Sequence, residues 1–337
     1  MKLSSRERFL AAMYRSPVDR APSAHVAALT TIELQEQTGC KMPDVHHDAD
    51  ALVTLCGANH DVLGFDAVCF NINYFGEPAA LGVEMNWGTA STYPNYVTHP
   101  WQTHEDAVIP DDLLSCPPIS IYLEAVRLAR RRYPHVGVIA KVMGPLSMVQ
   151  VMHGVDQTMM DMIERPALIA HYLAVACEIL ARCAHAELEA GADAVSLGEG
   201  GAGGNMLSPR LHRRFLAPVH AGLLRDIAGP TVLHICGDIL PRLDAIVDSR
   251  PTCFNFDWEI EPVTMVRAAQ GRVSLMGNLS TTDLLLGSEE EIAAQVIANL
   301  DAGVEIIAPG CATSPECPNA SFLAMHEAIA RWTSSRT

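Results

Sequence analysis

Basic residues are scarce in this sequence of 337 residues. It holds 23 Lys and Arg against 39 Asp and Glu, which gives a formal net charge of −16 at pH 7. A nucleic-acid backbone and an anionic membrane surface are both negatively charged, so this balance argues against either as the main partner. Charged residues make up only 18% of the chain and apolar residues 49%, which excludes global disorder and allows a large buried core.

The sequence also lacks a targeting segment and a convincing membrane span. Residues 1–22 contain no uninterrupted apolar run like the core of a signal peptide. The most apolar long stretch, 167–190, contains Glu178, Arg182 and Glu187, which a membrane-spanning helix would bury in lipid. The 10 cysteines are irregularly spaced, as is typical of reduced thiols rather than a disulfide framework. We therefore expect a soluble, cytoplasmic protein.

Short apolar runs alternate with longer helical patterns from residue 136 onward. The runs stand at 136–143, 192–197, 231–235, 252–256, 272–277 and 304–309. Helices are expected between and after them, near 156–190 with a break at Pro166, and at 209–228, 239–248, 262–269, 289–301 and 319–332. Short apolar strands that are each followed by a helix indicate parallel βα units.

The first third of the chain is less regular. A capped helix is expected from Ser4 or Ser5, further helical pieces near 31–38 and 48–63, and apolar runs at 24–29 and 66–72. One or two strands here bring the total to about eight, which favours a (β/α)8 TIM barrel with N-terminal helical additions over an open sheet. No charged block or tandem repeat divides the chain, so we predict a single domain over residues 1–337.

Polar residues gather where the predicted strands end. In a TIM barrel the carboxyl ends of all strands meet at one face, and the chemistry lies there. We therefore expect the residues that end or follow these runs to converge on one site. They are Glu199, His234, Cys236, Asp257, Asn278 and Cys311.

The pair His234 and Cys236 carries the most specific signal. Side chains two residues apart in an extended segment point the same way, so the two can grip one ion. Cys311 would complete a His-Cys-Cys set, and three protein ligands with an open fourth position are typical of catalytic zinc. The alternative is a hydrogen-bonded core histidine with two small buried cysteines. Cys317 could compete with Cys311 as a ligand.

With these residues in place, the sequence resembles the uroporphyrinogen decarboxylase superfamily nearly end to end. The opening SSRERFLAAMYRSPVDRAP and the later blocks GPLSMVQVMHG, GNLSTTDLLLGSEEEI and GVEIIAPGCATSPECP carry the resemblance. It implies a TIM barrel with extra N-terminal helices. True decarboxylases in this family grip porphyrinogen carboxylates with an arginine-rich N-terminal segment, whereas residues 21–39 here contain no arginine.

The other branch of the family consists of methylcobamide-dependent methyltransferases, whose zinc signature is HxC with a later cysteine. HICG and PGC match it at His234, Cys236 and Cys311. The resemblance implies a zinc-dependent transfer of a methyl group from a methylated corrinoid to a thiol such as coenzyme M, or to another acceptor such as tetrahydrofolate. The alternatives are a tetrapyrrole decarboxylase and a non-catalytic barrel that binds a corrinoid.

The same resemblance suggests roles for the remaining candidates. Glu199 and Asp257 are candidate catalytic residues, with Asp257 before Glu259 as a possible fourth zinc ligand, and Asn278 is a candidate cofactor-binding residue. The DxHxxG signature of cobalamin domains is absent from the sequence. We therefore expect the methylcobamide to arrive on a separate corrinoid protein that docks transiently.

Overall fold

Seven parallel strands form the central sheet of this protein, whose structure is a computed structural model that describes residues 2–336. The strands pair in the order β1-β4-β5-β6-β7-β8-β9. Their bounds are β1 (Ala67–Cys69), β4 (Gly137–Met143), β5 (Ala194–Gly198), β6 (Thr231–Ile235), β7 (Cys253–Phe256), β8 (Ser274–Leu279) and β9 (Ile306–Pro309). Every residue in them is buried, as expected for a parallel sheet that is covered on both faces.

The sheet is closed by residues 22–26, which occupy the eighth position between β9 and β1. Ser23 forms an isolated parallel bridge with Ile307, whose N–H donates to Pro22 O at 2.9 Å. On the other side, the N–H of Asp66 donates to Ser23 O at 2.9 Å. The predicted (β/α)8 barrel is therefore confirmed, with the apolar run near residue 24 supplying the eighth position.

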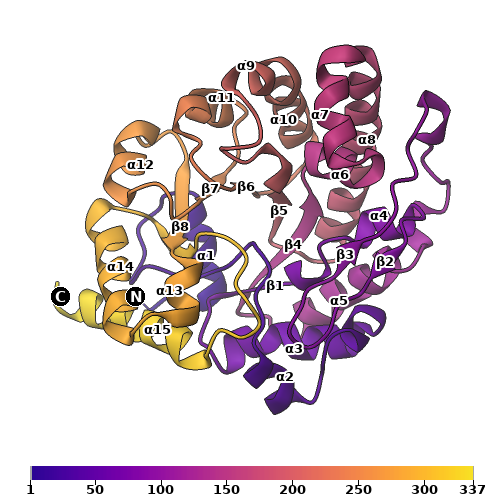
Figure 1. Ribbon diagram of the computed structural model, residues 1–337. Coiled ribbons are helices and arrows are strands. Elements are labelled where there is room, and N and C mark those ends of the chain that lie inside the picture. Colours follow the sequence, from indigo (N-terminus) through magenta and orange to yellow (C-terminus); the bar gives the residue numbers. More distant parts are fainter. Residues whose placement is uncertain (1, 337) are drawn as a thin grey trace.

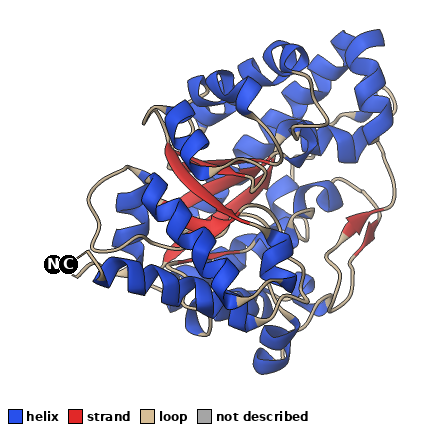
Figure 2. Cartoon of the chain, turned by 60° about the vertical axis from the view of Figure 1, so that its left-hand side comes forward, coloured by secondary structure: helices blue, strands red, loops and turns tan. Residues whose placement is uncertain are grey.

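Helices surround the strands, as the ring in Figure 1 and the side view in Figure 2 show. From β4 onward they are α6 (Pro145–His153), α7 (Val155–Glu164), α8 (Pro166–Glu189), α9 (Pro209–Leu211), α10 (Ala217–Asp226), α11 (Leu243–Asp248), α12 (Pro262–Ala269), α13 (Thr281–Leu286), α14 (Glu289–Ala302) and α15 (Asn319–Ser334). The predicted break at Pro166 separates α7 from α8. The proline lies in the first turn of α8, where backbone N–H groups have no partner within the helix, so its lack of an N–H costs no hydrogen bond.

The N-terminal third contributes helices and one hairpin. These elements are α1 (Ser5–Met13), α2 (Ile32–Thr38), α3 (Ala49–Asp61), α4 (Gly76–Ala80), α5 (Ile119–Arg132) and the antiparallel pair β2 (Met85–Asn86) and β3 (Asn95–Tyr96). Ser4 caps α1 through a capping box with Glu7, as its sequence predicts. The sequence pattern did not predict α4, α5, α6 or α13.

Helix α8 is long and apolar enough to satisfy the length and composition criteria of a membrane span. It packs on β4, α6 and α7, and 44% of its most apolar window is buried. A core helix of a globular protein passes the same test, so α8 is weak evidence for a membrane.

The strand register brings the carboxyl ends together at one face. Gly198 at the end of β5 pairs with His234 of β6, and His234 pairs in turn with Asn255 of β7. Because all strands run the same way, the loops that follow them share this face.

Candidate metal centre and its pocket

Strand β6 supplies two of the three candidate metal ligands. His234 is the fourth residue of this strand and Cys236 follows its last residue, so the two side chains share one side of the chain. Gly237 then turns the chain with φ of 74°, a conformation that favours glycine. A side chain there would also meet the backbone of Gly204 at 3.0 Å.

The loop after β9 supplies the third ligand. Gly310 passes so close to the loop after β7 that a Cβ on it would lie 2.7 Å from the Trp258 backbone nitrogen. This close approach, which only glycine allows, carries the next residue, Cys311, toward the end of β6.

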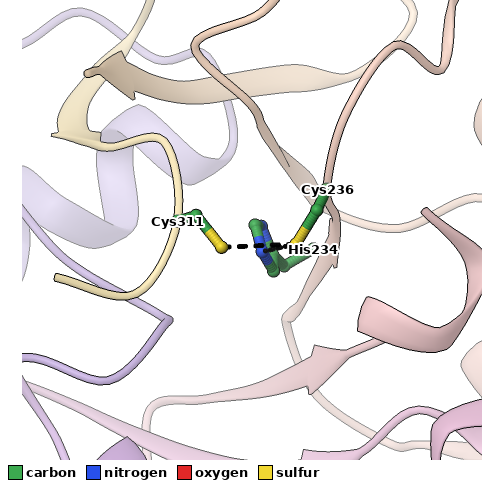
Figure 3. A group of neighbouring side chains, drawn as sticks. All are labelled: His234, Cys236 and Cys311. Atoms are coloured by element: carbon green, nitrogen blue, oxygen red, sulfur yellow. Dashed lines mark hydrogen bonds between the residues drawn. The ribbon is translucent and has the colours of Figure 1, made fainter. Parts of the chain in front are cut away.

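The three side chains meet at the carboxyl face, as Figure 3 shows. His234 Nε2 lies 3.1 Å from Cys236 Sγ, which lies 3.3 Å from Cys311 Sγ. The two cysteines are free, and the ligand atoms of all three residues lie within 4.8 Å of one another. The predicted convergence of these residues is present in the structure.

Hydrogen bonds among the three side chains favour the deprotonated form of Cys311. A hydrogen bond from the Cys236 thiol, together with contact with His234, lowers the pKa of Cys311 to about 4 against the opposing effect of burial. The same hydrogen bond and burial raise the pKa of Cys236. Burial would lower the pKa of His234, but hydrogen bonding to Cys311 and its negative charge outweigh burial and raise it. A thiolate beside an imidazole and a second thiol is a soft donor set that suits zinc.

The spacing of the donors also fits such an ion. Zinc–sulfur bonds of about 2.3 Å at a tetrahedral angle place two sulfurs ~3.8 Å apart, so the 3.3 Å between Cys236 and Cys311 would open by only ~0.5 Å. All three residues line a pocket, so the fourth side of the cluster faces open space that a substrate can enter.

This pocket has a volume of about 240 Å³. Beyond the three donors it is lined by Ala27, Ala28, Asn71, Tyr74, Phe75, Tyr93, Gly198, Gly200 and Ala312. None of these residues was predicted as a site residue from the sequence. Most of them come from segments without a regular pattern of apolar residues, and the neighbouring aromatic residues Tyr74 and Phe75 are the feature of the sequence that could have pointed to this wall.

The candidate acidic ligands lie beside the cluster rather than in it. Asp257 is buried, and its Oδ1 accepts from the N–H of Glu259 at 3.2 Å. Among residues 2–336, neither carboxylate belongs to the group that could hold a metal ion, and neither does Cys317, which is buried further along the loop. Asp257 does act electrostatically on the cluster, since its negative charge helps to raise the pKa of Cys236.

Glu199 is fully buried, and its carboxylate is occupied by protein groups. Oε1 accepts from the Ser147 N–H at 2.8 Å and from the Ser147 hydroxyl at 2.9 Å. Oε2 accepts from the Leu146 N–H at 3.2 Å and contacts His220 Nε2 at 2.9 Å. Glu199 therefore satisfies the free N–H groups in the first turn of α6 and ties that helix to His220 in α10. It does not line the pocket.

We expect Glu199→Ala to lower stability and to leave the metal in place. Removing this carboxylate orphans several buried donors, at a cost of roughly 3 kcal/mol. Urea unfolding midpoints and zinc content of the purified variant measure the two effects. Glu199→Gln keeps one acceptor oxygen and should fall between wild type and Ala. A variant of normal stability without turnover would instead show that Glu199 acts on the substrate.

Asn278 is likewise used within the protein. Its Nδ2 donates to the carbonyl of Asp257 at 3.0 Å and to that of Ile260 at 2.7 Å. It lines a separate surface pocket beside Trp258 and Ser280, away from the three metal donors. Its geometry is that of a residue that fixes the loop after β7.

Comparison with known proteins adds an independent line of evidence. A family model described as uroporphyrinogen decarboxylase (URO-D) matches residues 4–332. The methylcobamide:CoM methyltransferase of Methanosarcina barkeri is 30% identical over 322 residues, 92% of this chain and 93% of the relative. A solved structure of a methyltransferase from Methanosarcina mazei matches with a TM-score of 0.95 at 28% identity and covers 98% of this chain and 99% of that one.

Fold and site together define the class of protein: a TIM-barrel enzyme with a His-Cys-Cys cluster on its carboxyl face. The chain belongs to the uroporphyrinogen decarboxylase family, and within it this chain falls in the methyltransferase branch. The uroporphyrinogen decarboxylase of Nitrosomonas europaea, by contrast, matches only 39% of the chain. The prediction of the methyltransferase branch is therefore confirmed over the decarboxylase alternative.

Proposed function

We propose that this protein moves a methyl group from a methylated corrinoid, carried by a separate protein, to a thiol held by zinc at His234, Cys236 and Cys311. The observation that carries the proposal is the meeting of three soft donors at the wall of a small pocket. The methylcobamide and thiol named for the Methanosarcina barkeri relative support the same reaction. A cytoplasmic location fits reduced cysteines at the site.

Zinc bound by these residues would supply a Lewis acid that keeps the acceptor thiol ionised at neutral pH. In the reaction, the acceptor sulfur attacks the methyl carbon, and an S–C bond forms while the Co–C bond breaks. Both electrons of the Co–C bond stay with cobalt, which leaves as Co(I). The aromatic walls of the pocket, Tyr74, Phe75 and Tyr93, exclude water from this sulfur and limit its approach directions.

The corrinoid must reach the pocket from the carboxyl face, where the loops after the strands lie. The carrier has to leave after each turnover, so we expect a transient interface of modest area. Free methylcobalamin should replace the loaded carrier poorly, because it brings the methyl group without the carrier's positioning. We further propose that residues 1–337 act as one domain.

The experiment is a methylcobalamin demethylation assay on purified protein with a panel of thiols and with tetrahydrofolate. We expect thiol-dependent loss of the Co–C bond, close to one zinc per chain, and loss of both after treatment with a chelator. Circular dichroism should remain unchanged, because the barrel core does not include the metal donors. Release of carbon dioxide from uroporphyrinogen, or corrinoid binding without methyl transfer to any acceptor, would contradict the proposal.

A further inference from the structure

The pocket beside the three metal donors presents an almost wholly apolar surface. Apart from those donors, its walls are alanine, glycine and aromatic residues with the single amide of Asn71, and no Lys or Arg is among them. Ala27 and Ala28 come from residues 21–39, the segment that contains no arginine. A ligand inside the pocket therefore meets no lysine or arginine side chain.

The two tyrosine hydroxyls in the walls are neutral and already bonded. The Tyr74 hydroxyl donates to Gly198 O at 2.6 Å, and the Tyr93 hydroxyl accepts from the Thr30 N–H at 3.1 Å. Burial raises the pKa of both tyrosines. Neither provides the charge that an anionic ligand needs.

The charges just behind the walls are mainly negative. Asp257 acts on the sulfur of Cys236, and Glu77 acts on Tyr74. The ammonium of Lys141 lies 5.0 Å from the Tyr74 ring centroid, but it is buried and donates to Glu77 at 3.0 Å. The charge of Lys141 is thus already paired with Glu77 and does not face the ligand space.

We propose that the methyl acceptor is a small, uncharged aliphatic thiol rather than a thiol with an anionic group such as the sulfonate of coenzyme M. This proposal rests on the proposed function and names the substrate class of the same site. A sulfonate two carbons from the reacting sulfur would lie inside the pocket, where it would lose water and gain no lysine or arginine partner, while the charge of the zinc is already balanced by its cysteine ligands and the bound thiolate. An alkyl chain in the same place is stabilised by burial against Phe75 and the alanines.

Pocket size supports the same class. Pockets for drug-sized ligands measure roughly 300–1,000 Å³, and this one measures about 240 Å³. It accommodates a thiol with a chain of a few carbons and is too small to enclose a pterin with its glutamate tail.

The test compares matched thiols on the zinc-loaded protein with methylcobalamin as donor. Propane-1-thiol, ethanethiol and 2-mercaptoethanol are uncharged, and 2-mercaptoethanesulfonate has nearly the same length with a negative charge. We expect kcat/KM for propane-1-thiol to exceed that for the sulfonate by at least ~100-fold. The reason is that a pocket discriminates more strongly against a charged group that must lose its water than against a ligand that differs by one methylene. Calorimetry with the S-methylated forms, methyl propyl sulfide and methyl-coenzyme M, measures the same preference without turnover.

A paired substitution at Ala27 separates charge from shape. Ala27→Lys adds a cation to the pocket wall, and Ala27→Met adds a chain of similar length without charge. Only the Lys variant should shift the preference toward the sulfonate, by at least ~10-fold, because it alone supplies a counter-charge.

The outcomes distinguish this proposal from the proposed function. Equal or better use of the sulfonate by wild-type protein would overturn the acceptor class and leave thiol methylation standing. Tighter binding of methyl propyl sulfide without turnover of any thiol would support the acceptor class and contradict the methyl transfer. Binding of neither methylated product would overturn the acceptor class.

Discussion

Cys236→Ala is expected to abolish both metal binding and methyl transfer while the barrel stays folded. The cluster has three protein donors, and two cannot hold zinc firmly with a substrate position still open. Loss of a residue that hydrogen-bonds to a metal ligand typically costs 10- to 100-fold in metal affinity or activity. Loss of a ligand itself should therefore cost at least ~10³-fold. Metal analysis, demethylation rates and circular dichroism on the same preparation measure the three effects.

Cys317→Ala provides the matched control. Cys317 lies on the same loop six residues after Cys311, is buried, and takes no part in the cluster. It should keep one zinc per chain and near-normal activity, whereas Cys311→Ala should behave like Cys236→Ala. Full zinc in both Cys236→Ala and Cys311→Ala would show that the metal binds elsewhere.

The strand ends predicted the convergence of His234, Cys236 and Cys311 because two simple geometric rules apply there. Alternation along an extended chain aims His234 and Cys236 the same way, and the parallel register brings the end of β9 to the same face. Both rules depend only on spacing and strand direction, which the sequence contains. Cys311 could therefore be paired with Cys236, 75 positions earlier, without any contact information.

The same rules could not tell which strand-end residues face the pocket. Glu199 and Asn278 also lie at the ends of strands, but the structure uses the first to cap α6 and the second to hold the loop after β7. The direction of such a side chain depends on the turn that follows the strand. No periodicity in the sequence encodes that turn.

The barrel itself was predictable where the βα repeat is regular and less so where it is not. Strand β6 was predicted to the residue at 231–235. Residues 22–26 pair with β9 through one bridge only and carry no alternating pattern. The wall residues Tyr74 and Tyr93 lie in short or irregular elements, where position is set by packing against distant strands rather than by local propensity.

Asp66→Ala should cause the largest loss of stability among the substitutions considered. The carboxylate of Asp66 is fully buried at the start of β1 and accepts from Arg8 at 2.7 Å, from Arg20 at 2.8 Å and from the Ser23 N–H at 3.0 Å. It therefore joins α1, the closing segment and β1 at one point. Breaking a buried ion pair by removing one partner typically costs 3–5 kcal/mol because the other charge stays buried, and Arg8 keeps Asp19 at 2.7 Å, so we expect a loss in the lower half of that range.

An exposed ion pair in the same protein isolates the effect of burial. Arg336 contacts Asp301 at 2.6 Å, with about half of each side chain exposed. Asp301→Ala should cost less than ~1 kcal/mol, because solvent already screens the pair. Urea unfolding midpoints of the two variants give the comparison. If Asp66→Ala shifts the midpoint no further than Asp301→Ala does, the buried network does not hold the barrel closed. A large shift of the urea midpoint in Asp66→Ala, with unchanged zinc content, would show that the ion-pair network at the start of β1 stabilises the fold independently of the metal donors at the opposite ends of the strands.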